Sequence, residues 1–80
     1  MDKFVSIIIV TYNSSKYIES CLHSIYNQET SFNYEVIIFD NNSTDQTVPL
    51  IQNQFKDVFV IKSDKNIGFA AANNEAVKKA

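Results

Sequence analysis

The 80-residue sequence predicts an α/β fold with the element order β-α-β-α-β-α and a parallel sheet. Three observations lead to this prediction. First, apolar runs rich in β-branched residues at 4–10, 34–39 and 58–62 are typical of strands that are covered on both faces. Second, the segments that follow these runs have helical spacing or helix-prone composition. Third, strands that alternate with helices of this length form parallel sheets with right-handed crossovers.

The first strand, 4–10, leads through the polar stretch TYNSS into a predicted helix. Ser14 or Ser15 is expected to cap this helix, and Glu19 lies in its first turn, where the helix dipole favours an anion. Cys21 is expected to be a small core residue. One apolar face is predicted by residues at i, i+3, i+4, i+7 and i+8, namely Ile18, Cys21, Leu22, Ile25 and Tyr26.

A polar connection, 28–33, leads to the second strand, 34–39. The next helix is expected to begin at Ser43, which forms a capping box with Gln46. Pro49 lacks a backbone N–H and disfavours helical geometry at the residue before it. We therefore expect either a kink or a short first turn, with the main helix starting near Pro49. The residues expected to face inward are Leu50, Ile51 and Phe55.

A shorter third strand, 58–62, is followed by a polar stretch, 63–66, and by an alanine-rich, helix-prone segment, 68–80. The sequence holds no repeat, linker or low-complexity segment. It ends in AVKKA, without a Gly or Pro stop signal and without a fourth strand. We therefore expect these residues to be the first half of a larger fold.

The composition excludes several classes of protein. Apolar content of 45% with one Gly and one Pro indicates a folded chain rather than a linker. Seven basic residues against nine acidic ones give a net charge of −2, so nucleic acid is not an expected partner. The single cysteine, Cys21, forms no internal disulfide and fits a reducing compartment. The longest apolar run is too short to span a bilayer.

Candidate site residues gather where the predicted strands end. In an open parallel sheet, ligands bind beyond the carboxyl ends of the strands, where the strand order reverses. The segments 11–13, 40–42 and 64–68 are expected to meet there, with a carboxylate, several amides, an aromatic ring and a glycine. No nucleophile stands beside a base, and His23 is expected to be structural. The sequence has neither a G-x-G-x-x-G nor a P-loop motif, which excludes both kinds of nucleotide site.

Asp40 follows the second apolar run directly. An ionised carboxylate only accepts hydrogen bonds, so its natural ligand partners are the imide N–H of a pyrimidine base or sugar hydroxyls. Tyr12 offers a flat ring on which a base could stack, and Asn42 tolerates a left-handed backbone. The plainer alternative for Asp40 is a turn-forming residue that hydrogen-bonds its own backbone.

Three blocks, VSIIIVTYNSSKYIESCLHSI, EVIIFDNNSTDQT and NIGFAAANNEA, together resemble the amino-terminal part of the family 2 glycosyltransferases. These inverting enzymes have the GT-A fold. The resemblance implies that residues 1–80 are the nucleotide-binding half of a glycosyltransferase domain: a three-layer, Rossmann-like half of a truncated GT-A fold without its acceptor half. The block NIGFAAANN is most similar to the bacterial rhamnosyltransferase-like branch.

The resemblance also implies roles for single residues. Thr11, Tyr12 and Asn13 correspond to the segment that lines the nucleotide base, and Asp40 corresponds to the acid that hydrogen-bonds a pyrimidine. Where the family often has Asp-Asp-Gly-Ser, this chain has Asp-Asn-Asn-Ser. Asn42 therefore takes the place of the glycine, which is a mild change because Asn tolerates the same backbone region.

Further roles fall on the third block. Asn66 and Gly68 correspond to the loop beside the nucleotide-sugar, and Gly68 lets the backbone approach a ligand closely. Asn73 and Asn74, in the helix that follows, correspond to the same site; the alternative is a polar stripe on a packed helix. Asn41 replaces the second acid of the family's motif, so an additional acidic role is not expected there.

The implied activity is transfer of a sugar from a nucleotide-diphosphate sugar to a glycan or lipid-linked acceptor with inversion. In the family, an Asp-x-Asp motif on a later strand binds a divalent cation, Mg or Mn, and a further acid is the general base. Both are missing from the sequence, so these residues alone are expected to bind no metal, to bind a nucleotide weakly and to catalyse nothing. The alternative is a non-catalytic α/β module that binds a nucleotide or a protein.

Two expectations concern the protein's surroundings. The protein is expected in the cytoplasm or peripherally at the inner face of the membrane. The first strand lies in the interior of the family's sheet, whereas here one side of 4–10 is expected to be an open, apolar edge. Such edges pair with other chains, which predicts a homo-oligomer through this strand.

Overall fold

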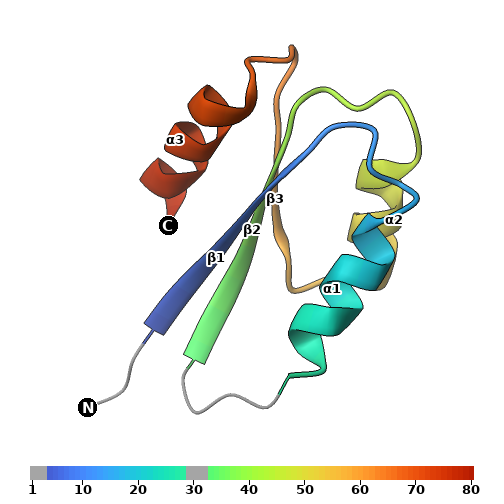
Figure 1. Ribbon diagram of the computed structural model, residues 1–80, viewed down its shortest axis with the longest axis vertical. Coiled ribbons are helices and arrows are strands. Elements are labelled where there is room, and N and C mark those ends of the chain that lie inside the picture. The colour runs from blue at the N-terminus through green and yellow to red at the C-terminus, as the bar shows by residue number, and fades with distance from the viewer. Residues whose placement is uncertain (1–3, 29–32) are drawn as a thin grey trace.

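The computed structural model describes residues 4–28 and 33–80, and it confirms the predicted order of strands and helices (Figure 1). The polar connection predicted at 28–33 lies almost entirely outside the described residues. The elements are β1 (Phe4–Thr11), α1 (Ile18–Tyr26), β2 (Asn33–Asp40), α2 (Thr47–Gln54), β3 (Phe59–Lys62) and α3 (Phe69–Lys79).

The three strands form a parallel sheet in the order β1-β2-β3. The middle strand, β2, has the longest run of buried residues. The register pairs Thr11 with Asp40 and Asp40 with Lys62. The last residues of the three strands are therefore level with one another across the sheet. This register places the segments that follow β1, β2 and β3 side by side at one edge of the molecule.

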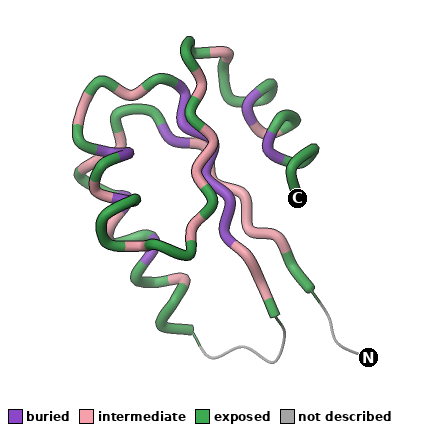
Figure 2. Tube along the Cα trace, turned by 180° about the vertical axis from the view of Figure 1, so that it is seen from behind, coloured by how far each residue is buried: buried purple, intermediate pink, exposed green. Residues whose placement is uncertain are grey.

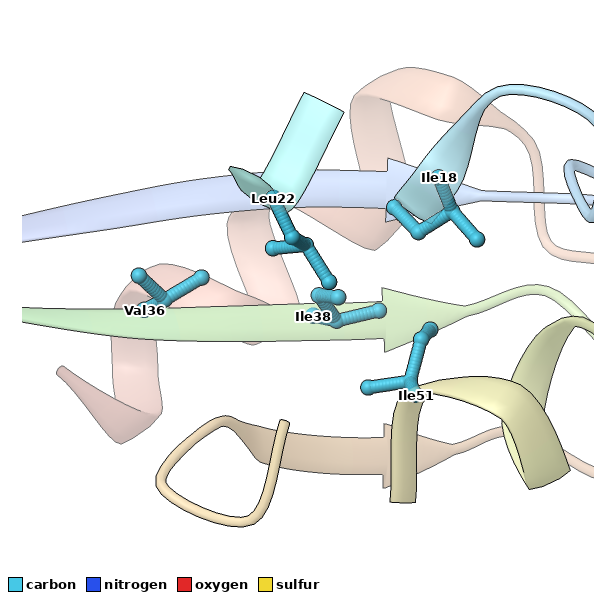
Figure 3. Close-up of a cluster of buried hydrophobic side chains, with 5 residues drawn as sticks. All are labelled: Ile18, Leu22, Val36, Ile38 and Ile51. Atoms are coloured by element: carbon cyan, nitrogen blue, oxygen red, sulfur yellow. The ribbon is translucent and has the colours of Figure 1, made fainter. Parts of the chain in front are cut away.

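Helices cover both faces of the sheet, which gives the predicted three layers (Figure 1). Side chains alternate along β2, so Val36 and Ile38 face α1 and α2, whereas Ile37 and Phe39 face α3. Buried residues accordingly concentrate along β2 and on the inner sides of the helices (Figure 2). Figure 3 shows the first of the two core clusters: Ile18, Leu22, Val36, Ile38 and Ile51.

Two predictions for α1 were wrong. Cys21 is exposed rather than part of the core, because it lies at the margin of the narrower stripe that Ile18 and Leu22 bury. Neither serine caps the helix with its side chain. The Ser14 carbonyl instead accepts hydrogen bonds from the backbone N–H groups of Tyr17 and Ile18, both at 2.9 Å, so a turn precedes the helix.

The predicted capping box at the start of α2 was also wrong. The hydroxyl of Ser43 donates to Asp40 at 2.6 Å, and the helix begins four residues later, at Thr47. There, the Asp45 carboxylate accepts the Thr47 N–H at 3.0 Å. Pro49 is the third residue of a continuous helix, because an N–H in the first turn has no intrahelical partner to lose.

Candidate functional site

The polar segments at the carboxyl ends of the strands form a hydrogen-bonded rim. We define the rim as residues 11–15 after β1, 40–45 after β2 and 63–68 after β3. All three segments lie at the same end of the sheet, at the top of the view in Figure 1. The first two lead into the helices on one face of the sheet, and the third leads into α3 on the other face.

Asp40 lies at the centre of the rim with a side chain that is only 2% exposed. Its Oδ1 accepts the hydroxyls of Thr11 and Ser43, each at 2.6 Å, and its Oδ2 accepts the Ser43 N–H at 2.8 Å. These three donors compensate for the removal of the carboxylate from water. Asp40 thus closes its own turn, as the plainer alternative predicted, and it also binds the end of β1.

Further hydrogen bonds join the first segment to the second. The backbone N–H of Asn13 donates to the Ser43 hydroxyl at 2.8 Å, and its Oδ1 accepts the Thr44 N–H at 2.8 Å. Asn13 makes both contacts from a left-handed backbone with φ of 48°, a region that Asn tolerates well. The Ser14 N–H donates to the Thr47 hydroxyl at 2.8 Å. The loop after β1 is therefore fixed to the start of α2.

Asn41 joins the second segment to the third, and sequence reasoning did not include it among the site residues. Its side chain is 3% exposed; Oδ1 accepts the Ile67 N–H at 3.1 Å and Nδ2 donates to the Gly68 carbonyl at 3.2 Å. Gly68 has φ of 86° and ψ of 169°, a conformation nearly restricted to glycine. The available signal was the position of Asn41, one residue beyond the central strand, between the two neighbouring strand ends.

The remaining predicted residues differ in how they join the rim. Tyr12 is 52% exposed, and Asn42 has the expected left-handed backbone with φ of 65° and an exposed side chain. The Asn66 side chain accepts the Gly68 N–H at 2.8 Å. Asn73 is different, because its amide donates to the Phe69 carbonyl within α3 at 3.2 Å and has no hydrogen bond to the rim among the described residues.

Two of the three carboxylates in the rim, those of Asp40 and Asp45, accept hydrogen bonds from protein donors. Besides Asp40, Asp45 accepts the hydroxyl and the N–H of Thr47 and the N–H of Ser15. The hydrogen bond from the Thr47 side chain is the main cause that lowers the pKa of Asp45 to about 2. Within residues 4–28 and 33–80, no three His, Cys, Asp or Glu side chains come together as metal ligands. The described donors therefore do not fit a divalent cation.

Comparisons with known proteins identify the family of the chain and related folds. The model of glycosyl transferase family 2 matches residues 6–80. A curated relative from Methanococcus voltae, dolichyl N-acetyl-α-D-glucosaminyl phosphate 3-β-D-2,3-diacetamido-2,3-dideoxy-β-D-glucuronosyltransferase, is 39% identical over 83 residues. The match covers 96% of this chain and 26% of that protein, so the chain spans about a quarter of its length.

Two solved structures share the fold. TarS 1–349 of S. aureus, in complex with UDP-GlcNAc, has a TM-score of 0.84 and 34% identity over 98% of this chain and 24% of its own. The mannosyltransferase PcManGT from Pyrobaculum calidifontis, in complex with GDP-Man and Mn²⁺, has a TM-score of 0.80 and 31% identity over 95% of this chain and 24% of its own. From the family match and these similarities, the chain belongs to glycosyl transferase family 2, and its α/β fold matches the amino-terminal portion of the GT-A fold of TarS.

Proposed function

We propose that the whole protein transfers a sugar from a nucleotide-diphosphate sugar to a glycan or lipid-linked acceptor with inversion, and that residues 1–80 are its nucleotide-binding half. The observation that carries the proposal is the rim, in which three strand-end segments are fixed to one another around Asp40. It lies in the part of the chain that matches TarS, whose structures hold UDP and UDP-GlcNAc.

In this proposal the base lies against the segment after β1. The exposed ring of Tyr12 supplies a stacking surface, and Thr11 and Asn13 hold that surface in place. Asp40 has two carboxylate oxygens with about four acceptor positions, of which the protein donors use three. The remaining position is proposed to accept the imide N–H of a pyrimidine.

The sugar side of the nucleotide is proposed to lie near Asn66, Gly68 and Asn73. A Cβ built on Gly68 would meet no atom within 4 Å, so there is open space above this backbone for a ligand. Asn42 adds an exposed carboxamide, which can donate and accept, on the segment after β2. The block NIGFAAANN supports a place in the rhamnosyltransferase-like branch.

The acceptor and the cation are proposed at the level of the whole protein. The name of the M. voltae relative contains a dolichyl-linked sugar phosphate, which supports a lipid-linked acceptor. The PcManGT structure contains Mn²⁺, which supports a divalent cation, Mg or Mn, whose ligands are not among the described residues.

Location and assembly are proposed on two further observations. The unpaired, exposed Cys21 fits the reducing cytoplasm. No helix in the described ranges is long and apolar enough to cross a bilayer, and attachment at the inner face of the membrane is proposed to be peripheral. Self-association is proposed through the edge of β1, which pairs with β2 alone among the described strands.

The test is a titration of the ¹⁵N-labelled protein with UDP and with dTDP, followed by NMR. We expect millimolar nucleotide to shift the amide signals of Tyr12, Asp40 and Gly68. Tyr12→Ala removes the stacking surface, which is worth about 1–3 kcal/mol per base, so it should weaken binding about 5- to 150-fold. The matched control, Tyr17→Ala, removes a tyrosine that is 73% exposed outside the rim and should change little. No shift with either nucleotide would refute the proposal and favour the non-catalytic module.

A further inference from the structure

Asn41 connects all three segments of the rim through one residue. Its backbone N–H donates to the Thr11 carbonyl at 2.8 Å. Its side chain accepts the N–H of Ile67 and donates to the carbonyl of Gly68. The ladder between β2 and β3 ends one residue earlier, where the Ser63 N–H donates to the Asp40 carbonyl at 2.9 Å. Beyond that point, the carboxamide of Asn41 replaces the missing backbone pairing.

We propose that Asn41 is a positioning residue that fixes the 66–68 loop at the sugar side of the nucleotide site, and that in this chain it does so through its amide, which donates to the Gly68 carbonyl and accepts the Ile67 N–H. The assignment of this loop to the sugar side of a nucleotide site rests on the proposed function. The contact uses one acceptor and one donor on the same side chain. A carboxylate would keep the acceptor for Ile67, but it would face the Gly68 carbonyl oxygen without a hydrogen to share.

The held loop also fixes the start of α3. The Gly68 carbonyl accepts the Ala72 N–H at 3.1 Å, the first backbone hydrogen bond of that helix, in addition to the Asn41 amide. Ala72 is fully buried against the sheet. Asn41 therefore links the end of the central strand to the loop and to the first turn of α3.

The first experiment measures the loop without any ligand. Amide hydrogen exchange is compared between the wild type, Asn41→Asp and the control Asn53→Asp, which makes the same chemical change on the exposed side of α2. We expect exchange at Ile67 and Ala72 to rise about tenfold or more in Asn41→Asp and to stay unchanged in the control. Unchanged exchange at both amides in folded Asn41→Asp overturns the proposal.

A measurement on the wild type keeps the proposal testable if Asn41→Asp does not fold. The side-chain NH₂ group of Asn41 should show one slowly exchanging hydrogen in the NMR spectrum, because Nδ2 donates to Gly68 in a buried position. The exposed side chain of Asn42 is the internal reference. Equal, fast exchange of the Asn41 and Asn42 side chains overturns the proposal.

The last experiment compares two ligands, UDP and UDP-GlcNAc. Displacement of the loop should weaken UDP-GlcNAc binding to Asn41→Asp by at least fivefold more than it weakens UDP binding. An equal loss for both ligands means that the added charge repels the diphosphate, and it overturns the sugar-side role. If the wild type binds neither ligand while the exchange results hold, the proposed function fails and the structural half of the inference stands.

Discussion

At the scale of single residues, the centre of the rim is held by two buried polar side chains, the Asp40 carboxylate and the Asn41 carboxamide, both paired with uncharged groups of the protein. Asp40 is buried without an ionic partner among the described residues, and two hydroxyls and one N–H take the place of water. Hydrogen bonds of this kind are worth more in a water-poor site, and an unpaired member is costly. The rim is therefore expected to behave as one unit, in which the loss of one donor affects its neighbours.

The pH dependence of stability is expected to report on Asp45. Its folded-state pKa of about 2 lies below the ordinary value near 3.9, so its contribution is present above pH ~4 and is lost as the pH falls toward 2. We expect the melting temperature of Asp45→Asn to lie below that of the wild type at pH 5–6. The difference should shrink as the pH falls from 4 to 2. A difference that does not change with pH would contradict this assignment.

At the scale of elements, stability depends on the apolar layer in which α1 and α2 pack against β2. Ile51 of α2 is fully buried in the cluster shown in Figure 3, whereas its neighbour Leu50 is half-buried. Ile51→Ala should cost about 2–5 kcal/mol of unfolding free energy, since it leaves a cavity that the layer cannot fill. Leu50→Ala is the control and should cost clearly less in the same denaturant titration. Equal losses would mean that α2 does not pack as described.

The strands and helices were predictable from the sequence because their signals are local. The apolar runs give β2 its two buried faces, and the stripe of Ile18 and Leu22 gives α1 its inner side. The helix starts were not predictable in the same way. Ser43 matches a capping box, but its hydroxyl binds Asp40, a contact that exists only when the strand end and the turn are folded together. Tertiary contacts thus overrode a local preference.

The same distinction applies to the candidate site. Tyr12 and Asp40 were candidates because they follow apolar runs, and Gly68 was a candidate through the resemblance to a family. The side-chain contacts of Asn41 could not be predicted, because they join a loop 26 residues away in the chain. A neighbouring amide, Asn42, has the same residue type but an exposed side chain, and only the fold distinguishes the two.

At the scale of the whole molecule, the sheet is asymmetric. β2 is paired on both sides and is buried from Val36 onward, whereas β1 has half-buried side chains along most of its length. Phe4 and Val5 at its start are exposed. The layers of helices cover the faces of the sheet, but within the described ranges no strand covers the outer side of β1. Its backbone groups on that side remain open for pairing.

This open edge leads to the prediction that the 80-residue chain self-associates through β1. An apolar strand of eight residues without Pro or Lys offers a template for a second copy. Sedimentation equilibrium at high concentration should give a mass approaching twice that of the chain or more. Val5→Lys places a charge on the edge and should shift the protein toward the monomer, while Phe59→Lys, on the opposite edge of the sheet, should not. A monomeric profile for the wild type at high concentration would refute the prediction, and a larger effect at Phe59 would assign the contact to β3.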